Sequence, residues 1–273
     1  MRLAFSPCPN DTFVFHAWVA GHVDGAPPVD VTYADIDVLN GVAERAEADV
    51  TKVSYGALPW LLADHRLLAS GSALGRGCGP LVLTRPGTDL DIATATVAVP
   101  GLRTTAYLLF RLWAATRGGV GRLEVMPFDR IMPAVRDGEV DAGLVIHESR
   151  FTYPSFGLES VQDLGDWWEA ETGLAIPLGA IVARRSLDTD ALARVIRASV
   201  ERAWAAPDDP ALAAYITEHA QEMDPDVQRQ HIELYVNAFT AELGGDGHAA
   251  VAGLLHRAAD AGLVPRVDAD ALR

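Results

Sequence analysis

Short apolar runs alternate with segments of helical periodicity over the first two thirds of the chain, and this alternation constrains the fold more than any other feature. The predicted strands cover residues 3–5, 29–33, 50–53, 81–84, 96–99, 123–126, 142–146 and 180–183. The predicted helices between them cover residues 12–19, 37–46, 105–115 and 131–137, where apolar side chains recur every three or four residues. From Asp188 onward, alanine-rich amphipathic segments follow one another without a further strand. We therefore predict an α/β fold with mainly parallel strands and a helical C-terminal segment.

The composition indicates a folded chain and argues against a polyanionic partner. The 273 residues are 49% hydrophobic, which suits one large domain or two small ones. The formal net charge of −15 repels phosphate backbones and anionic lipid, so we predict no nucleic-acid partner and no membrane partner. Net charge does not describe the inside of a cleft, so an anionic small molecule remains open as a ligand.

The N-terminal residues and the cysteines indicate a cytoplasmic protein. Pro7 and Pro9 fall where a secretory signal needs an unbroken apolar core. No run approaches the roughly 20 apolar residues needed to span a bilayer. Only Cys8 and Cys78 are present, so we expect no disulfide framework, and no spacing typical of metal ligands occurs.

Two segments predict a division into lobes. Residues 85–87, Arg-Pro-Gly, follow an apolar strand, and the apolar stretch 174–183 runs back toward the helical tail. If both are hinge crossings, residues 1–86 and 178–273 form one discontinuous lobe and residues 87–177 form the other. We expect a ligand to bind between them, where strand ends and domain interfaces normally place it.

Two loops offer polar groups at predicted helix starts. Asn10, Asp11 and Thr12 follow the first strand, and any of them can cap the helix or meet a ligand, because free N–H groups at a helix start favour carboxylates and hydroxyls. Residues 100–105 form a similar loop that ends in two threonines. A cap needs only one threonine, so we expect Thr105 to face a ligand.

The third predicted strand ends in polar residues. Lys52 and Ser54 lie on the same face by the period of two. A strand covered by helices on both faces should be apolar throughout, so this end indicates a binding edge, the alternative being a solvated strand terminus.

The glycines at 71, 75, 77 and 79 resemble a phosphate-binding loop only in spacing. A strand follows them, whereas a dinucleotide-binding fingerprint must open a helix. We therefore predict no nucleotide cofactor.

One of the eight histidines stands out by its position. His147 follows the apolar run 142–146, which delivers it to the edge of the sheet, and an imidazole with a pKa near 6.5 in a cleft suits proton abstraction. An isolated histidine is more often structural, and we assign the others to loops, to the first helix or, for four of them, to exposed or half-buried positions on the helical tail. These others are His16, His22, His65, His219, His231, His248 and His256.

Five motifs together resemble the 1,4-dihydroxy-6-naphthoate synthases of menaquinone biosynthesis by the futalosine route. They are SPCPNDTF at 6–13, ADVTKVSYGAL at 48–58, SGSALGRGCGPL at 70–81, TTAY at 104–107 and DAGLVIHESRFTY at 141–153. The motifs occur in matching order over residues 1 to about 185.

The resemblance implies a two-lobed, periplasmic-binding-protein-like (type II) fold with an interlobe cleft. It also implies a cofactor-free lyase that converts cyclic dehypoxanthinyl futalosine, an anionic substrate, into 1,4-dihydroxy-6-naphthoate. The family's proposed base matches His147. Its binding segments correspond to Lys52, Val53 and Ser54 in one lobe and to Thr105 and Ala106 in the other.

Two alternative functions remain at this stage. Chorismate dehydratase, the sister enzyme of the route, has the same expected architecture, and a non-catalytic solute-binding protein shares the fold. The sequence also leaves open whether the chain forms a homodimer.

Overall fold

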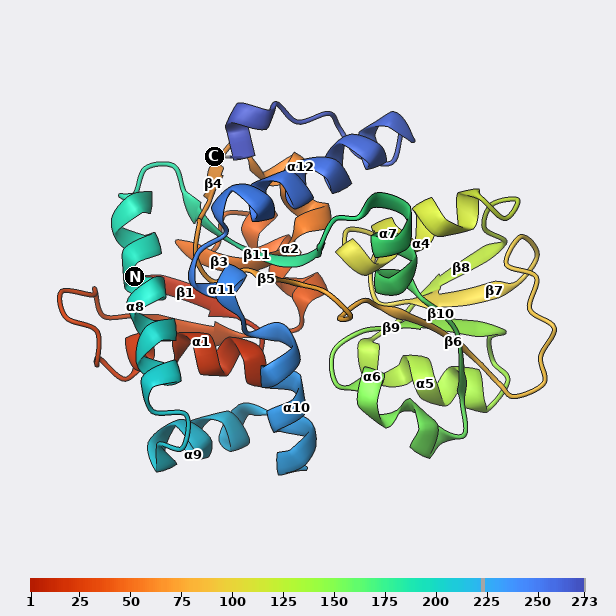
Figure 1. Cartoon of the computed structure of the whole chain (residues 1–273), viewed down its shortest axis with the longest axis horizontal. Helices are drawn as coiled ribbons and strands as arrows, with labels where there is room; N and C mark the ends of the chain where they lie inside the picture. The colour runs from red at the N-terminus through yellow and green to blue at the C-terminus, as the bar shows by residue number, and fades with distance from the viewer. Residues whose placement is uncertain (222–223, 273) are drawn as a thin grey trace.

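The computed structural model describes residues 1–221 and 224–272, and it contains two β-sheets that lie side by side (Figure 1). The N-terminal elements build one half of the molecule and the middle of the chain builds the other (Figure 1). Within the described ranges, no helix is long and apolar enough to cross a membrane.

The first sheet has the order β2-β1-β3-β11-β4, and β5 also pairs with β11. Its strands are β1 (Arg2–Phe5), β2 (Asp30–Tyr33), β3 (Val50–Ser54), β4 (His65–Leu67), β5 (Ala73–Gly75) and β11 (Ile176–Arg184). The helices inserted between them are α1 (Pro9–Val19), α2 (Ile36–Glu44), the 3₁₀ turn η1 (Tyr55–Ala57) and α3 (Leu58–Leu61). Phe5 of β1 stacks on Phe15 of α1 with ring centroids 4.5 Å apart, which fixes this helix against the sheet.

The second sheet has the order β10-β6-β9-β7-β8. Its strands are β6 (Leu81–Thr84), β7 (Thr96–Val99), β8 (Arg122–Val125), β9 (Ala142–Val145) and β10 (Glu159–Asp163). Its helices are α4 (Thr105–Ala115), α5 (Phe128–Arg136), α6 (Ser149–Thr152), η2 (Tyr153–Phe156) and α7 (Leu164–Thr172). All four residues of β9 are buried, so the strand that precedes His147 lies inside the sheet with both faces covered.

The strand directions differ from the sequence-based expectation. Strand β1 pairs in parallel with β2 and β3, and β7 pairs in parallel with β8 and β9. Strand β11, however, is antiparallel to β3, β4 and β5, and β6 is antiparallel to both β9 and β10. The prediction of mainly parallel strands is therefore wrong. Strands β6 and β11 each follow a crossing between the two halves, and both run antiparallel to their neighbours.

The strand pairing also moves the first crossing between the two halves. Strand β6 pairs with β9 and β10 in the second sheet, so the chain crosses between β5 and β6 and not at residues 85–87. On the return, β11 pairs with β5 from Ile176 onward, close to the expected residue 178. We therefore propose a lobe division that follows sheet membership: residues 1–75, 176–221 and 224–272 form lobe 1, and residues 81–163 with α7 form lobe 2.

The C-terminal segment is helical, as predicted from Asp188 onward. It contains α8 (Thr189–Ala205), α9 (Pro210–His219), α10 (Pro225–Tyr235), α11 (Ala238–Ala241), α12 (Gly244–Asp260) and η3 (Ala269–Leu272). Aspartates cap the first three, and proline occupies the first helical position of α9 and α10, where its missing N–H costs nothing.

Helix α12 packs on both lobes. Val251 and Leu255 join the hydrophobic core of lobe 1, while Leu254 and Ala258 join the core of lobe 2 around Trp168. The helical segment therefore holds the two lobes together in addition to covering one of them.

The crossing between β5 and β6 requires a glycine at position 79. A Cβ atom there would lie 2.0 Å from the backbone nitrogen of Gly165 at the start of α7. We expect Gly79→Ala to lower the free energy of unfolding by about 1–3 kcal/mol, because backbone must move to relieve the overlap. Urea denaturation measures the change.

Gly245→Ala is the matched control, since a Cβ atom at this exposed helical position meets nothing within 4 Å. This substitution should leave the free energy of unfolding unchanged or raise it slightly. Equal stabilities for both variants would contradict the close packing assigned to the crossing.

Candidate functional site

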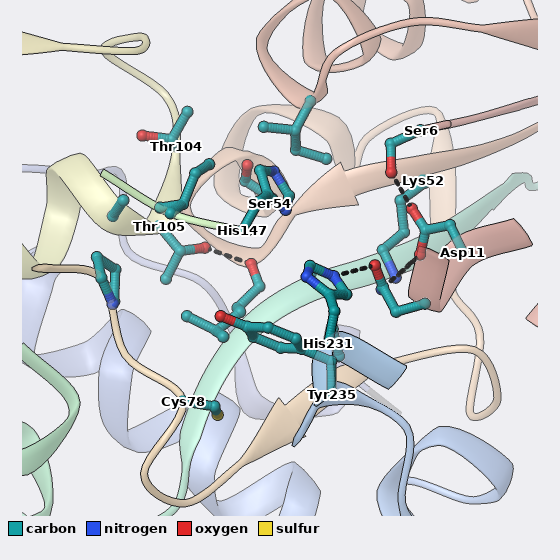
Figure 2. A pocket seen from close by; sticks show the side chains of 18 residues that line it. Ser6, Asp11, Lys52, Ser54, Cys78, Thr104, Thr105, His147, His231 and Tyr235 are labelled. Carbon is teal, nitrogen blue, oxygen red and sulfur yellow. Dashed lines mark hydrogen bonds and ion pairs between the residues drawn. The ribbon is translucent and has the colours of Figure 1, made fainter. Parts of the chain in front are cut away.

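A cavity lies between the two lobes (Figure 2). Residues of both lobes and of the C-terminal segment form its wall. They are Ser6, Asn10, Asp11, Ile36, Lys52, Ser54, Ala73, Cys78, Pro80, Thr104, Thr105, Ala106, Ile146, His147, Leu178, Gly179, His231 and Tyr235.

A buried ion pair forms one wall of this cavity. The Lys52 Nζ lies 2.8 Å from Asp11 Oδ1, and the two side chains are only 5% and 2% exposed. Asp11 also accepts hydrogen bonds from Ser6 Oγ at 2.6 Å and from Asn10 Nδ2 at 3.0 Å, and Lys52 donates to the Gly71 carbonyl at 3.1 Å. Both charges are therefore hydrogen-bonded on several sides, which a buried pair requires.

The end of β3 is held by a side chain from α2. The Asn40 amide oxygen accepts from the Ser54 backbone N–H at 2.8 Å, and its nitrogen donates to Ser54 Oγ at 3.2 Å. Lys52 and Ser54 both line the cavity, as their shared strand face predicts. Val53 points to the opposite face and packs in the core of lobe 1.

The two threonines at the start of α4 form different contacts. Thr104 caps the helix, because its Oγ1 accepts from the Tyr107 backbone N–H at 3.1 Å. The Thr105 hydroxyl reaches into lobe 1, where it donates to the Leu178 carbonyl at 2.7 Å and accepts from the Gly56 N–H at 3.0 Å. Thr105 thus lines the cavity and also fastens the lobes to each other.

Further contacts show that the lobes are closed over the cavity. Arg103 of lobe 2 forms an ion pair with Glu44 of lobe 1, and its guanidinium lies 4.4 Å from the centre of the Trp60 ring. The backbone at Gly101 comes so near Asp37 that a Cβ atom would overlap its carboxylate. Closure of this kind removes water from the space between the lobes.

His147 occupies a strained backbone position at the end of β9. Its φ angle of 54° is left-handed, a conformation that is uncommon outside glycine and that sets the direction in which the imidazole leaves the strand. The Phe128 ring meets its imidazole edge-on with centroids 5.6 Å apart. The imidazole borders both the inner cavity and a second, outer cavity, whose wall includes Asp35 and Met126.

The surroundings of His147 favour a neutral imidazole. Burial lowers its pKa below the ordinary value near 6.5, and Lys52 adds to this effect, while Asp11 and Asp35 oppose it. A neutral ring at neutral pH has a free lone pair and can accept a proton.

Cys8 is the nearest partner of that imidazole. Its Sγ lies 3.6 Å from Nδ1 of His147, a contact between the start of α1 in lobe 1 and the end of β9 in lobe 2. Burial raises the pKa of the Cys8 thiol well above its ordinary value, and the Glu148 carboxylate raises it further. The thiol therefore stays protonated.

Glu148 lies closer to His147 than strand alternation suggests. One donor atom each of Cys8, His147 and Glu148 lie within 4.8 Å of one another, because the chain turns at His147 and no longer continues as a strand. The trio is also a candidate metal-binding group, although a metal on the imidazole would occupy the lone pair that a base needs.

The structure brings seven of the predicted site residues to the cavity wall. They are Asn10, Asp11, Lys52, Ser54, Thr105, Ala106 and His147. Within the described ranges, Thr12 and Val53 are not part of that wall: the Thr12 hydroxyl donates to the carbonyls of Cys8 and Pro9 in its own helix. Thr12 therefore stabilises the start of α1.

Sequence reasoning missed the contribution of the helical tail. His231 and Tyr235, one turn apart on α10, both line the cavity, and His231 Nε2 lies 2.9 Å from Asn10 Oδ1. The spacing of four on an amphipathic helix was the available signal, but it is equally typical of ordinary packing.

The chain is similar in sequence to proteins of known function. A family model described as menaquinone biosynthesis matches residues 1–260. A curated 1,4-dihydroxy-6-naphthoate synthase from Streptomyces coelicolor is 63% identical over 278 residues and covers 100% of this chain and 97% of its own. One from Thermus thermophilus is 47% identical over 266 residues, with 96% and 95% covered.

Solved structures agree with the expected fold. A protein from Archaeoglobus fulgidus matches with a TM-score of 0.89 at 35% identity, covering 96% of this chain and 98% of its own. The periplasmic aliphatic sulphonate binding protein of Escherichia coli matches with a TM-score of 0.69 at 10% identity, covering 99% and 90%. The second likeness concerns the fold alone and confirms the periplasmic-binding-protein-like architecture.

Replacing Lys52 tests the ion pair. We expect Lys52→Met to lower the free energy of unfolding by about 3–5 kcal/mol, because the Asp11 carboxylate remains buried without its counter-charge. The double variant Lys52→Met/Asp11→Asn removes both charges and should regain part of the loss. Urea denaturation of the three proteins measures the difference. A loss below about 1 kcal/mol in the single variant would show that the pair behaves like an exposed one.

Proposed function

The chain belongs to the menaquinone biosynthesis family, and on that premise we infer that it is a 1,4-dihydroxy-6-naphthoate synthase, a lyase. We propose that it cleaves cyclic dehypoxanthinyl futalosine and that His147 is the general base. The observation that supports the base most directly is the position of the His147 imidazole at the junction of two cavities, where desolvation lowers its pKa.

The proposed reaction begins when the lobes close on the substrate. Closure excludes water and aligns the reacting bond with the imidazole, and both effects contribute more than basicity alone. His147 then takes a proton from the substrate, the electrons released by this step drive cleavage of a carbon–carbon bond, and the remaining carbon atoms leave as a second fragment. The product is aromatic, and its aromatisation supplies the driving force without a redox cofactor.

We propose that the anionic group of the substrate binds near the start of α4. The positive charge of Lys52 is already matched by Asp11 at 2.8 Å, so it is not free to pair with a second carboxylate. Ala106 and Thr105 stand in the first turn of the 11-residue helix α4 and line the cavity. N–H groups at such a helix start favour an anion. The proposed binding residues are thus Thr105 and Ala106 in lobe 2, with Asn10, Asp11, Lys52 and Ser54 shaping the opposite wall.

The proposed reaction suggests a subcellular location for the enzyme. A biosynthetic enzyme of this kind is expected in the cytoplasm, where its substrate is made.

Two substrates separate this function from its sister activity. The purified protein is incubated with cyclic dehypoxanthinyl futalosine and, separately, with chorismate, and the products are identified by mass spectrometry. We expect 1,4-dihydroxy-6-naphthoate from the first and no 3-carboxyethenoxybenzoate from the second. Conversion of chorismate alone would contradict the proposal, and binding without any conversion would indicate a solute-binding protein.

Replacing His147 tests the base. We expect His147→Asn to lower kcat by about 10²- to 10⁴-fold, because no other group in line with the substrate then takes the proton. Product binding, measured by calorimetry, and the unfolding temperature should change little. Near-normal turnover would overturn the assignment.

Two controls accompany the His147 variant. His256→Asn replaces a half-buried histidine on α12 outside the cavity wall and should leave kcat unchanged. Treatment with EDTA should also leave the wild-type rate unchanged, since a metal held by Cys8, His147 and Glu148 would block the proposed base. Loss of activity on chelation would instead assign that trio to a metal.

A further inference from the structure

His231 has a ring nitrogen that is buried at the cavity without a partner. The residue is 1% exposed and lines the cavity together with His147 (Figure 2). Its Nε2 lies 2.9 Å from the Asn10 side-chain oxygen, whereas its Nδ1 has no hydrogen-bond partner within the described residues. A buried polar atom without a partner destabilises the protein. A ligand that forms a hydrogen bond with this atom removes the penalty, which makes binding more favourable.

The hydrogen-bond network fixes which nitrogen of His231 carries the proton. Asp11, paired with Lys52, is a carboxylate that can only accept, so the amide nitrogen of Asn10 must face it at 3.0 Å. The Asn10 oxygen is then turned toward His231 and needs a donor. Nε2 therefore bears the hydrogen, and in the neutral ring Nδ1 is left with a lone pair.

The ring is held neutral by its neighbours. Burial lowers the pKa of His231 well below the ordinary value, and the nearby His147 and Lys52 lower it further. His231 packs against Tyr235 on the same helix, with ring centroids 4.6 Å apart and 40° between the ring planes, and this contact restricts the orientation of the imidazole. Nδ1 is consequently an acceptor of set position and direction.

We propose that His231 is a substrate-positioning residue whose Nδ1 accepts a hydrogen bond from a hydroxyl group of the substrate. This inference rests on the proposed function, because it assigns a second contact within the same cavity. The His147 and His231 rings are nearly parallel, with centroids 6.1 Å apart and 22° between their planes. A substrate hydroxyl bound to Nδ1 would therefore hold the molecule beside the proposed base.

The same acceptor also selects among substrate groups. A neutral nitrogen with a lone pair attracts a hydroxyl and repels a carboxylate oxygen, which has no proton to donate. The hydroxyl-bearing part of the substrate is thus directed to α10, and its carboxylate to the start of α4. The two contacts together specify the orientation of the substrate in the cavity.

The protonation of His231 can be measured directly in the free protein. Two-bond ¹H–¹⁵N correlation spectra of the full-length chain at neutral pH distinguish the two neutral tautomers and the cation. The His231 signals are identified by their absence from the spectrum of His231→Gln. We expect a protonated Nε2 and an unprotonated Nδ1. A proton on Nδ1, or an imidazolium, would overturn the inference, and this readout does not depend on activity.

Two substitutions separate positioning from mere packing. The Asn side chain can place an oxygen near the position of Nδ1, while the Gln side chain can place its amide nitrogen near Nε2. His231→Gln thus keeps the bond to Asn10 and loses the acceptor, and we expect kcat/KM to fall about tenfold, mainly through KM. His231→Asn keeps an acceptor in the cavity, so its kcat/KM should fall less than that of His231→Gln.

The opposite ranking would contradict the proposal. If His231 only ties α10 to Asn10, His231→Asn is the more damaging change in both unfolding temperature and kcat/KM, and His231→Gln is close to wild type. The proposed function fails separately: a wild-type protein that does not convert cyclic dehypoxanthinyl futalosine rejects it, whatever the tautomer of His231.

Discussion

The buried ion pair between Asp11 and Lys52 is the interaction on which the geometry of the site depends. It connects the start of α1 to β3, and Asp11 can be buried there because Lys52, Ser6 and Asn10 all donate to it. The pair fixes the Asn10 amide, which in turn fixes the proton on an imidazole from α10. It also neutralises the only lysine of the cavity wall, so the proposed anion site lies elsewhere.

The second constraint is the closed arrangement of the lobes. The Thr105 hydroxyl joins α4 to lobe 1 through the Leu178 carbonyl and the Gly56 N–H, and helix α12 contributes to the cores of both lobes. His147 is half-buried between the lobes, and the resulting desolvation is the main cause of its lowered pKa. The same packing that holds the lobes together therefore keeps the imidazole in the form that accepts a proton.

Local patterns predicted the parts of the structure that local forces determine. Strands β6 and β7 and helix α4 begin and end where the sequence indicates, because apolar runs and a threonine cap mark their limits. The edge strand β10 was missed because much of it is exposed, and β4 and β5 were missed because each has only three residues. Strand direction and the role of His231 depend on tertiary packing: Asn10 and His231 are 221 positions apart, and no local pattern relates them.

The pH dependence of kcat/KM tests the central claim most directly, namely that a half-buried, neutral His147 is the base. This profile reports groups of the free enzyme, and a base must be unprotonated to act. Since burial lowers the pKa of His147, activity should persist below pH 6.5 and fall only as the pH drops through that lowered pKa. An acid limb whose midpoint lies at or above 6.5 would contradict the account, because it would place the base in a solvated or anionic environment.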